Sequence, residues 1–150
     1  MTQPDSAEKD DFDLRNFLPF LLNQAAEESS LDFQKVYKNR YGMLRTEWRV
    51  LFHLGNYGEM TAKQIGERAK MHKTKISRAV HKLEQRRYLR RTRDENDRRM
   101  ERLTLTPAGL AVYRELRDIA RDYDARLTGM FTTGESALLR MMLRRLAGMD

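Results

Sequence analysis

The sequence predicts a mainly α-helical fold with one small β-hairpin, and three observations lead to this expectation. Apolar residues recur at helical spacing over most of the chain, strand-like alternation is confined to residues 88–106, and hydroxyl side chains precede several helical stretches. With 150 residues, of which 40% are hydrophobic, the chain can bury one modest core. We therefore expect a single compact fold with appendages.

The first part of the chain predicts an arm followed by a long helix. Residues 1–11 are polar and acidic, and we expect them to form a flexible arm. From residue 12 to about residue 41, apolar positions recur at helical spacing. Asn16 is a candidate cap of this helix, with Pro19 inside the tolerated first turn, and an interruption near Pro19 is the alternative.

Two shorter helices are expected next. A helix of roughly ten residues follows Thr46 and is expected to end at Gly55 and Gly58, where C-terminal caps favour glycine. Thr61 and Gln64 have the spacing of a capping box, in which each of the two side chains accepts a hydrogen bond from the backbone N–H of the other residue. This spacing predicts a short third helix.

The fourth helix is amphipathic and basic. Ile76, Val80 and Leu83 fall at positions i, i+4 and i+7, and a brief turn at residues 71–72 separates this helix from the third. Such a pair is a helix-turn-helix, whose second helix enters the major groove of DNA. A solvated surface helix is the alternative. The DNA-contact candidates on this helix are Lys73, Thr74, Lys75, Ser77, Arg78, His81 and Lys82.

A charged hairpin and two more helices complete the prediction. Residues 88–93 and 100–106 alternate as strands around a polar turn, and a hairpin directly after a helix-turn-helix predicts a wing. Thr106 and Pro107 open a long helix to about Phe131, and the capping-box spacing from Thr132 opens a last one. The apolar stripes of the first and last helices are too wide for a monomer of this size to cover, which predicts a homodimer.

Charge and composition favour some classes of function and exclude others. Residues 61–106 carry 15 basic and 6 acidic side chains, a net charge of +9 against +7 for the whole chain, which favours double-stranded DNA as the partner. The absence of cysteine excludes disulfides, thiolate metal sites and cysteine nucleophiles. No catalytic motif is present, so we expect neither an enzyme nor a cofactor. The apolar runs are too short to span a membrane, and we expect a cytoplasmic protein without a metal site.

The chain resembles the MarR family of bacterial transcription regulators. The resemblance covers residues 12–148 and depends on Ser77-Arg78, Asp97-Arg98-Arg99 and the Leu103–Gly109 run, which reads Leu-Thr-Leu-Thr-Pro-x-Gly. It implies a winged helix-turn-helix DNA-binding domain at residues 42–106 and a helical dimerisation domain formed by residues 12–41 and 107–150. It also implies a dimeric repressor of a pseudo-palindromic operator, released by a small-molecule effector such as an aromatic acid or its coenzyme A thioester.

The same resemblance assigns roles at the wing turn. Arg99 is similar to the family's arginine that enters the minor groove, where the negative potential favours a guanidinium, and Asp97 to the carboxylate that orients it. An ordinary polar turn is the alternative. Arg98 joins them as a DNA-binding candidate, and Arg90, Arg91, Arg93 and Arg102 are expected beside phosphates.

An effector pocket is expected where the first and second predicted helices meet, because aromatic side chains and hydrogen-bond donors concentrate there. Its candidate residues are Tyr37, Tyr41, Trp48, Arg49 and His53. Core packing of Trp48, a satisfied histidine at His53 and a surface ion pair at Arg49 are the alternatives. Two other functions also remain open: a winged-helix module that binds protein or nucleic acid without sequence preference, and a nucleic-acid hydrolase.

Overall fold

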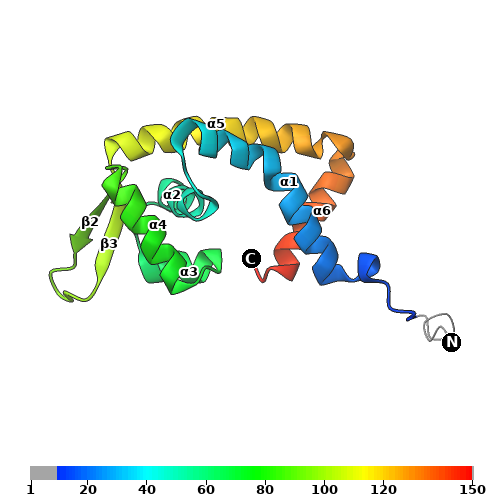
Figure 1. The fold of residues 1–150 in the computed structure, drawn as a ribbon, viewed down its shortest axis with the longest axis horizontal. Coiled ribbons are helices and arrows are strands. Elements are labelled where there is room, and N and C mark those ends of the chain that lie inside the picture. The colour runs from blue at the N-terminus through cyan, green and yellow to red at the C-terminus, as the bar shows by residue number, and fades with distance from the viewer. Residues whose placement is uncertain (1–9, 150) are drawn as a thin grey trace, which may run out of the picture. The chain divides into compact units, whose positions relative to one another are not determined.

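The computed structural model describes residues 10–149 and has a mainly helical fold with one small antiparallel sheet, as the sequence predicts (Figure 1). Our arm prediction for residues 1–11 therefore lies largely outside the described residues. The elements in chain order are η1 (Leu14–Asn16), α1 (Leu18–Tyr41), α2 (Arg45–Tyr57), β1 (Met60–Thr61), α3 (Ala62–Ala69), α4 (Lys73–Gln85), β2 (Leu89–Arg93), β3 (Glu101–Leu105), α5 (Pro107–Leu127), η2 (Thr128–Met130) and α6 (Thr133–Leu146).

The chain divides after Asp32 into two compact units. In the first unit, Asp13 caps η1 by accepting a hydrogen bond from the backbone N–H of Arg15 at 3.0 Å. Asn16 lies inside η1, so its predicted role as the cap of the long helix is wrong. Pro19 is the second residue of α1, where its missing N–H leaves no bond unmade. The large apolar side chains exposed in this unit are Phe12, Leu14, Phe17, Leu18, Leu21 and Leu31.

The second unit, from Phe33 on, contains the core. Helix α2 runs through Gly55 and ends at Gly58, whose φ of +83° is a conformation that favours glycine. A Cβ at Gly55 would lie 2.3 Å from the ring of Tyr113, so α5 packs directly against the α2 backbone there. The predicted end at Gly58 is confirmed, but the one at Gly55 is wrong, and Thr46 lies within α2 because the helix begins at Arg45.

The helix-turn-helix consists of α3 and α4. Thr61 and Gln64 form the predicted capping box: the Gln64 N–H donates to the Thr61 hydroxyl at 3.1 Å, and the Thr61 N–H donates to the Gln64 side-chain oxygen at 2.9 Å. Ile76, Val80 and Leu83 are buried on α4, as their spacing predicts. The buried faces of both helices therefore point into the same core and leave the polar faces outside.

The sheet has three strands in the order β1-β3-β2, all antiparallel. Leu89 pairs with Leu105 and Arg93 with Glu101, which makes residues 89–105 the predicted hairpin, hereafter the wing. Strand β1 adds a third, two-residue edge through the pairing of Met60 with Leu103. A strand of two residues has no readable alternation, so the sequence did not predict it.

Helices α5 and α6 begin as predicted. The Thr106 hydroxyl accepts a hydrogen bond from the Gly109 N–H at 3.0 Å, and Thr132 and Glu135 form a capping box. Helix α5 ends at Leu127 and continues as η2, so the predicted helix to Phe131 is too long by one 3₁₀ turn. No described residue of α6 is buried, and its large exposed apolar side chains are Leu138, Met141, Met142, Leu143 and Leu146.

Candidate nucleic-acid interface

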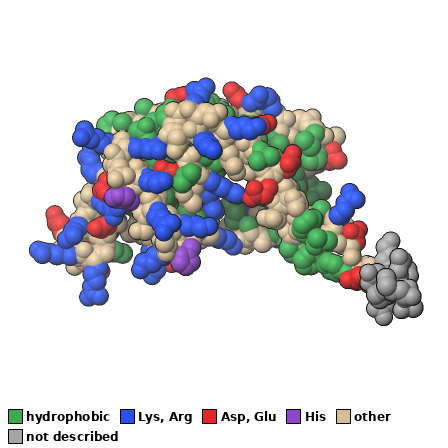
Figure 2. All heavy atoms as spheres, viewed as in Figure 1, with side chains coloured by type: hydrophobic (Ala, Val, Ile, Leu, Met, Phe, Trp, Pro, Cys, Tyr) green, Lys and Arg blue, Asp and Glu red, His purple; other side chains and the backbone are tan. Residues whose placement is uncertain are grey.

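One face of α4 is exposed and almost entirely polar. Ile76, Ala79, Val80 and Leu83 occupy the buried face, so the remaining positions must point outward. All seven candidates on this helix are exposed, and we call them the α4 face: Lys73, Thr74, Lys75, Ser77, Arg78, His81 and Lys82. Figure 2 shows Lys and Arg side chains gathered over α3, α4 and the wing.

The first turn of α4 adds partial positive charge to this face. Its backbone N–H groups have no partners within the helix, and the helix dipole places positive potential at this end. The Nδ1 atom of His72 accepts one of these groups, the Thr74 N–H, at 3.3 Å. With Lys73 and Lys75 in the same turn, the start of α4 is suited to a phosphate oxygen.

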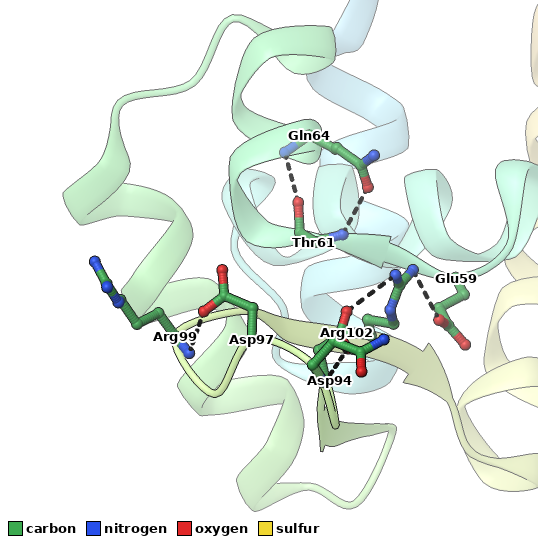
Figure 3. Close-up of polar contacts among 8 residues, drawn as sticks. Glu59, Thr61, Gln64, Asp94, Asp97, Arg99 and Arg102 are labelled. Atoms are coloured by element: carbon green, nitrogen blue, oxygen red, sulfur yellow. Dashed lines mark hydrogen bonds and ion pairs between the residues drawn. The ribbon is translucent and has the colours of Figure 1, made fainter.

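The wing turn is held by backbone hydrogen bonds. The Asp97 carboxylate accepts a bond from the Arg99 N–H at 3.1 Å, and the Met100 N–H donates to the Asp97 carbonyl at 2.9 Å. Figure 3 shows the Arg99 side chain extending away from Asp97. In this structure the Asp97 carboxylate thus shapes the turn, and its role in orienting the Arg99 guanidinium stays a prediction.

Two arginines of the wing form ion pairs within the protein. Arg102 lies 3.4 Å from Glu59 and 3.3 Å from Asp94 (Figure 3). On the other face of the sheet, Arg91 lies 3.2 Å from Glu84 and 3.1 Å from Glu101. Arg91 and Arg102, which we expected beside phosphates, are thus paired with carboxylates of the protein.

The pKa of Asp94 is lowered from its ordinary value. The main cause is the hydrogen bond that its carboxylate accepts from the Asn96 backbone, and the Arg102 guanidinium acts in the same direction. The carboxylate is therefore ionised at neutral pH and keeps its charge for Arg102. No carboxylate among residues 10–149 lies within ion-pairing distance of Arg90, Arg93, Arg98 or Arg99, and all four are exposed.

Two of the predicted effector residues, Tyr37 and Trp48, belong to an aromatic cluster. Tyr37 and Trp48 stack with ring centroids 5.8 Å apart, and Phe33 and Phe52 complete an aromatic cluster around them. Burial raises the pKa of Tyr37. The Nε1 atom of Trp48 is buried and has no hydrogen-bond partner within residues 10–149, so this cluster retains one unused donor.

The other three predicted effector residues have partners elsewhere. The Tyr41 hydroxyl donates to Glu115 on α5, and burial together with this bond raises its pKa to about 12. The Arg49 guanidinium donates to the Ala69 carbonyl at the end of α3, and the His53 ring lies 2.6 Å from the Arg49 carbonyl. The alternative of a satisfied histidine thus fits His53.

The sequence did not predict a cavity of about 480 Å³ between α3, α4 and β3. Apolar side chains line it together with Lys63, Arg91 and, from the α4 face, Lys73 and Ser77. No spacing rule within one helix could identify it, because α3, α4, β2 and β3 all contribute to it. The full lining is Ala62, Lys63, Gly66, Met71, Lys73, Ile76, Ser77, Val80, Arg91, Glu101 and Leu103.

Residues 10–149 lack two kinds of feature. No group of three or more histidine or acidic side chains is placed to hold a metal ion there. In the same range, no helix has both the length and the apolar character needed to cross a membrane.

Comparisons with known proteins agree with this geometry. A MarR family model matches residues 41–100, which include α2, the helix-turn-helix and most of the wing. The HTH-type transcriptional regulator SarZ of Staphylococcus aureus is 32% identical over 95 residues, covering 61% of this chain and 64% of SarZ. The chain thus spans just under two thirds of the length of this relative.

Solved structures extend the likeness to nearly the whole chain. A probable transcriptional regulator from Pseudomonas aeruginosa is 28% identical, with a TM-score of 0.74 over 89% of this chain and 99% of that protein. BpsR of Bordetella bronchiseptica, whose DNA binding is regulated by 6-hydroxynicotinic acid, has a TM-score of 0.83 over 94% and 100% of the two chains. At 20% identity, this likeness shows a shared fold alone.

Proposed function

Since this chain is a winged-helix protein of the MarR family, we propose that it is a sequence-specific, DNA-binding transcription regulator that acts as a homodimer. The α4 face carries the proposal, because all seven of its side chains are exposed beside a wing that presents four arginines without an ion-pair partner in residues 10–149. The family and its relatives are regulators rather than enzymes. Such a function places the protein with the chromosome, in the cytoplasm.

Each part of this surface has its own task in the proposal. The α4 face enters the major groove, where lysine and arginine contact guanine edges or phosphates and hydroxyls contact phosphates. Asp97 fixes the wing turn, and Arg98 and Arg99 reach the backbone and the adjacent minor groove.

The exposed apolar side chains support the homodimer. Helix α6 has no buried described residue, and the first unit exposes six large apolar side chains. Apolar faces of this extent are normally covered in solution, and a second copy of the chain would cover them symmetrically. A two-fold dimer would place two α4 helices about 34 to 36 Å apart, in successive major grooves of a pseudo-palindromic operator.

We also propose repression relieved by a small aromatic acid or its coenzyme A thioester. The aromatic cluster around Tyr37 and Trp48 offers stacking surfaces and one buried, unused donor. The cavity beside α4 is the second candidate site, because its lining combines Lys63 with Lys73 and Ser77 of the α4 face. Tyr41, Arg49 and His53 would then shape the surroundings of the aromatic cluster rather than bind the ligand.

The alternative is a winged-helix module that binds proteins or nucleic acids without sequence preference. The experiment that separates the two is a titration of the protein with a fluorescent duplex from upstream of its own gene, beside a scrambled duplex of equal length. At roughly 150 mM salt, specific and non-specific binding separate. A preference of about a hundredfold or more supports the regulator. Equal, weak binding supports the alternative.

Repeating the titration with aromatic acids and acyl thioesters tests the effector. A compound that abolishes the preference supports ligand-controlled repression. Loss of its effect in Trp48→Phe, which lacks the indole donor, assigns the ligand to the aromatic cluster. Loss in Lys63→Ala assigns it to the cavity beside α4 instead.

A further inference from the structure

We propose that Arg102 is a positioning residue for DNA binding, which fixes the wing against the rest of the lobe through Glu59 and Asp94 and does not itself contact DNA. The inference rests on the proposed DNA-binding function. It adds a residue whose guanidinium pairs with carboxylates of the protein and not with DNA phosphates. It also replaces the expectation that Arg102 lies beside a phosphate.

The position of Arg102 in the sheet allows one guanidinium to join both edges. Arg102 lies on β3, the central strand, and pairs with Thr61 of β1 and Thr92 of β2. Glu59 directly precedes β1, and Asp94 directly follows β2. Because the Nη1 atom faces Glu59 at 3.4 Å and the Nη2 atom faces Asp94 at 3.3 Å, the side chain spans the full width of the sheet (Figure 3).

Asp94 connects this bridge to the turn that carries Arg99. Its N–H donates to the Met100 carbonyl at 3.0 Å, and its carboxylate accepts the Asn96 N–H at 2.9 Å. Asp94 therefore holds the start of the turn through both its backbone N–H and its carboxylate. A guanidinium held between Asp94 and Glu59 thus limits how far the turn, and Arg99 with it, can move away from β1.

The local charge argues against a phosphate contact by Arg102. Its single positive charge faces two carboxylates, so the net charge at this point of the wing is negative. Arg90 offers a direct comparison, because it lies on the same face of the sheet, opposite Thr104, and is exposed without a carboxylate partner among residues 10–149. A phosphate approaching this face meets a free positive charge at Arg90 and a neutralised one at Arg102.

The other face of the wing has a similar bridge. Arg91 joins Glu84, near the end of α4, to Glu101 at the start of β3. The wing is therefore tied to α4 by Arg91 and to β1 by Arg102. Exposed ion pairs contribute little each to global stability, but here they act on a two-stranded hairpin, which they join to β1 and to α4.

The test compares Arg102→Ala, Glu59→Ala and the control Arg90→Ala in titrations of the upstream duplex at several salt concentrations. Arg102→Ala should bind about fivefold more weakly with an unchanged salt dependence. Glu59→Ala should also bind more weakly, although it removes a negative charge, and the double variant should be no weaker than Arg102→Ala. Arg90→Ala should flatten the salt dependence by about one unit of slope.

Hydrogen exchange without DNA gives an independent readout. The amides of residues 94–100 should exchange faster in Arg102→Ala and Glu59→Ala than in the wild-type protein or Arg90→Ala. The proposal is overturned if Glu59→Ala binds DNA as tightly as wild type or more tightly, or if Arg102→Ala flattens the salt dependence like Arg90→Ala. A wild-type protein that prefers neither duplex defeats the proposed function. If the wild-type protein prefers the upstream duplex and the Arg102→Ala and Glu59→Ala variants bind it as tightly as wild type, only this inference is defeated.

Discussion

The Arg86 guanidinium lies 3.8 Å from the carboxylate of Glu47, whose side chain is only 1% exposed. Arg86 directly follows α4, and Glu47 lies in the first turn of α2, where its other oxygen accepts the Leu44 N–H at 2.6 Å. The same guanidinium donates to the carbonyls of Tyr41 and Gly42, at the end of α1. One side chain thus connects the ends of three helices and fixes the C-terminal end of α4.

Arg86→Ala should lower the free energy of unfolding by about 2 kcal/mol, because it leaves the buried Glu47 carboxylate without its positive partner. Urea denaturation followed by circular dichroism measures this change. Adding Glu47→Gln should recover part of the loss, since it removes the unpaired charge. Arg90→Ala, at an exposed position without such a partner, should leave stability unchanged within about 0.5 kcal/mol. Equal stability of Arg86→Ala and wild type would show that Glu47 does not depend on Arg86.

Arg99→Ala should weaken binding to the upstream duplex by about tenfold, because the wing loses the guanidinium that extends from its turn. The dimer and the melting temperature should stay as in wild type, since the Arg99 side chain is exposed and the turn depends on its backbone N–H. Fluorescence anisotropy and sedimentation measure the two properties. An unchanged affinity at moderate salt would remove the wing from the interface.

Lys75→Ala should lower affinity for both the upstream and the scrambled duplex and flatten the salt dependence by about one unit of slope, as for one lost phosphate contact. Arg114→Ala, which removes an exposed charge from α5, is the matched control and should leave the slope unchanged. A loss confined to the upstream duplex would instead assign Lys75 to base recognition.

Glu115 predicts a pH dependence of stability. Hydrogen bonds from the Tyr41 hydroxyl and the Arg40 guanidinium lower its pKa from the ordinary value of 4.5. Since the folded pKa is below the unfolded one, this stabilisation is present above pH 4.5 and is lost as pH falls through the folded pKa. Between pH 7 and pH 3, wild type should therefore lose more stability in urea than Glu115→Gln. Parallel losses in the two proteins would contradict the assignment.

Local patterns predicted the helix-turn-helix because its determinants lie within a few residues of one another. Thr61 and Gln64 are three residues apart, and Ile76, Val80 and Leu83 repeat along one helix. The errors have non-local causes. Gly55 resembles a helix end in sequence, but it lies within α2, and the Tyr113 ring of α5 occupies the space that a Cβ there would fill.

In the candidate site, too, local features could be predicted from the sequence and non-local contacts could not. Exposure of the α4 face followed from helical periodicity, whereas the partners of Arg102 are 43 and 8 residues away in sequence and required the sheet to be known. Tyr37 and Tyr41 share a helical spacing, yet Tyr41 bonds to Glu115, 74 residues later, while Tyr37 stacks on Trp48. Composition alone could not decide between these partners.

Hydroxyl-radical footprinting of the DNA upstream of the protein's own gene tests the central claim most directly. A dimer with two α4 helices in successive major grooves should protect two segments related by a two-fold axis, with centres one helical turn, about 10 base pairs, apart. The two segments should be protected on the same side of the duplex. Uniform cleavage, or protection that follows no fixed position, would contradict a sequence-specific dimeric regulator.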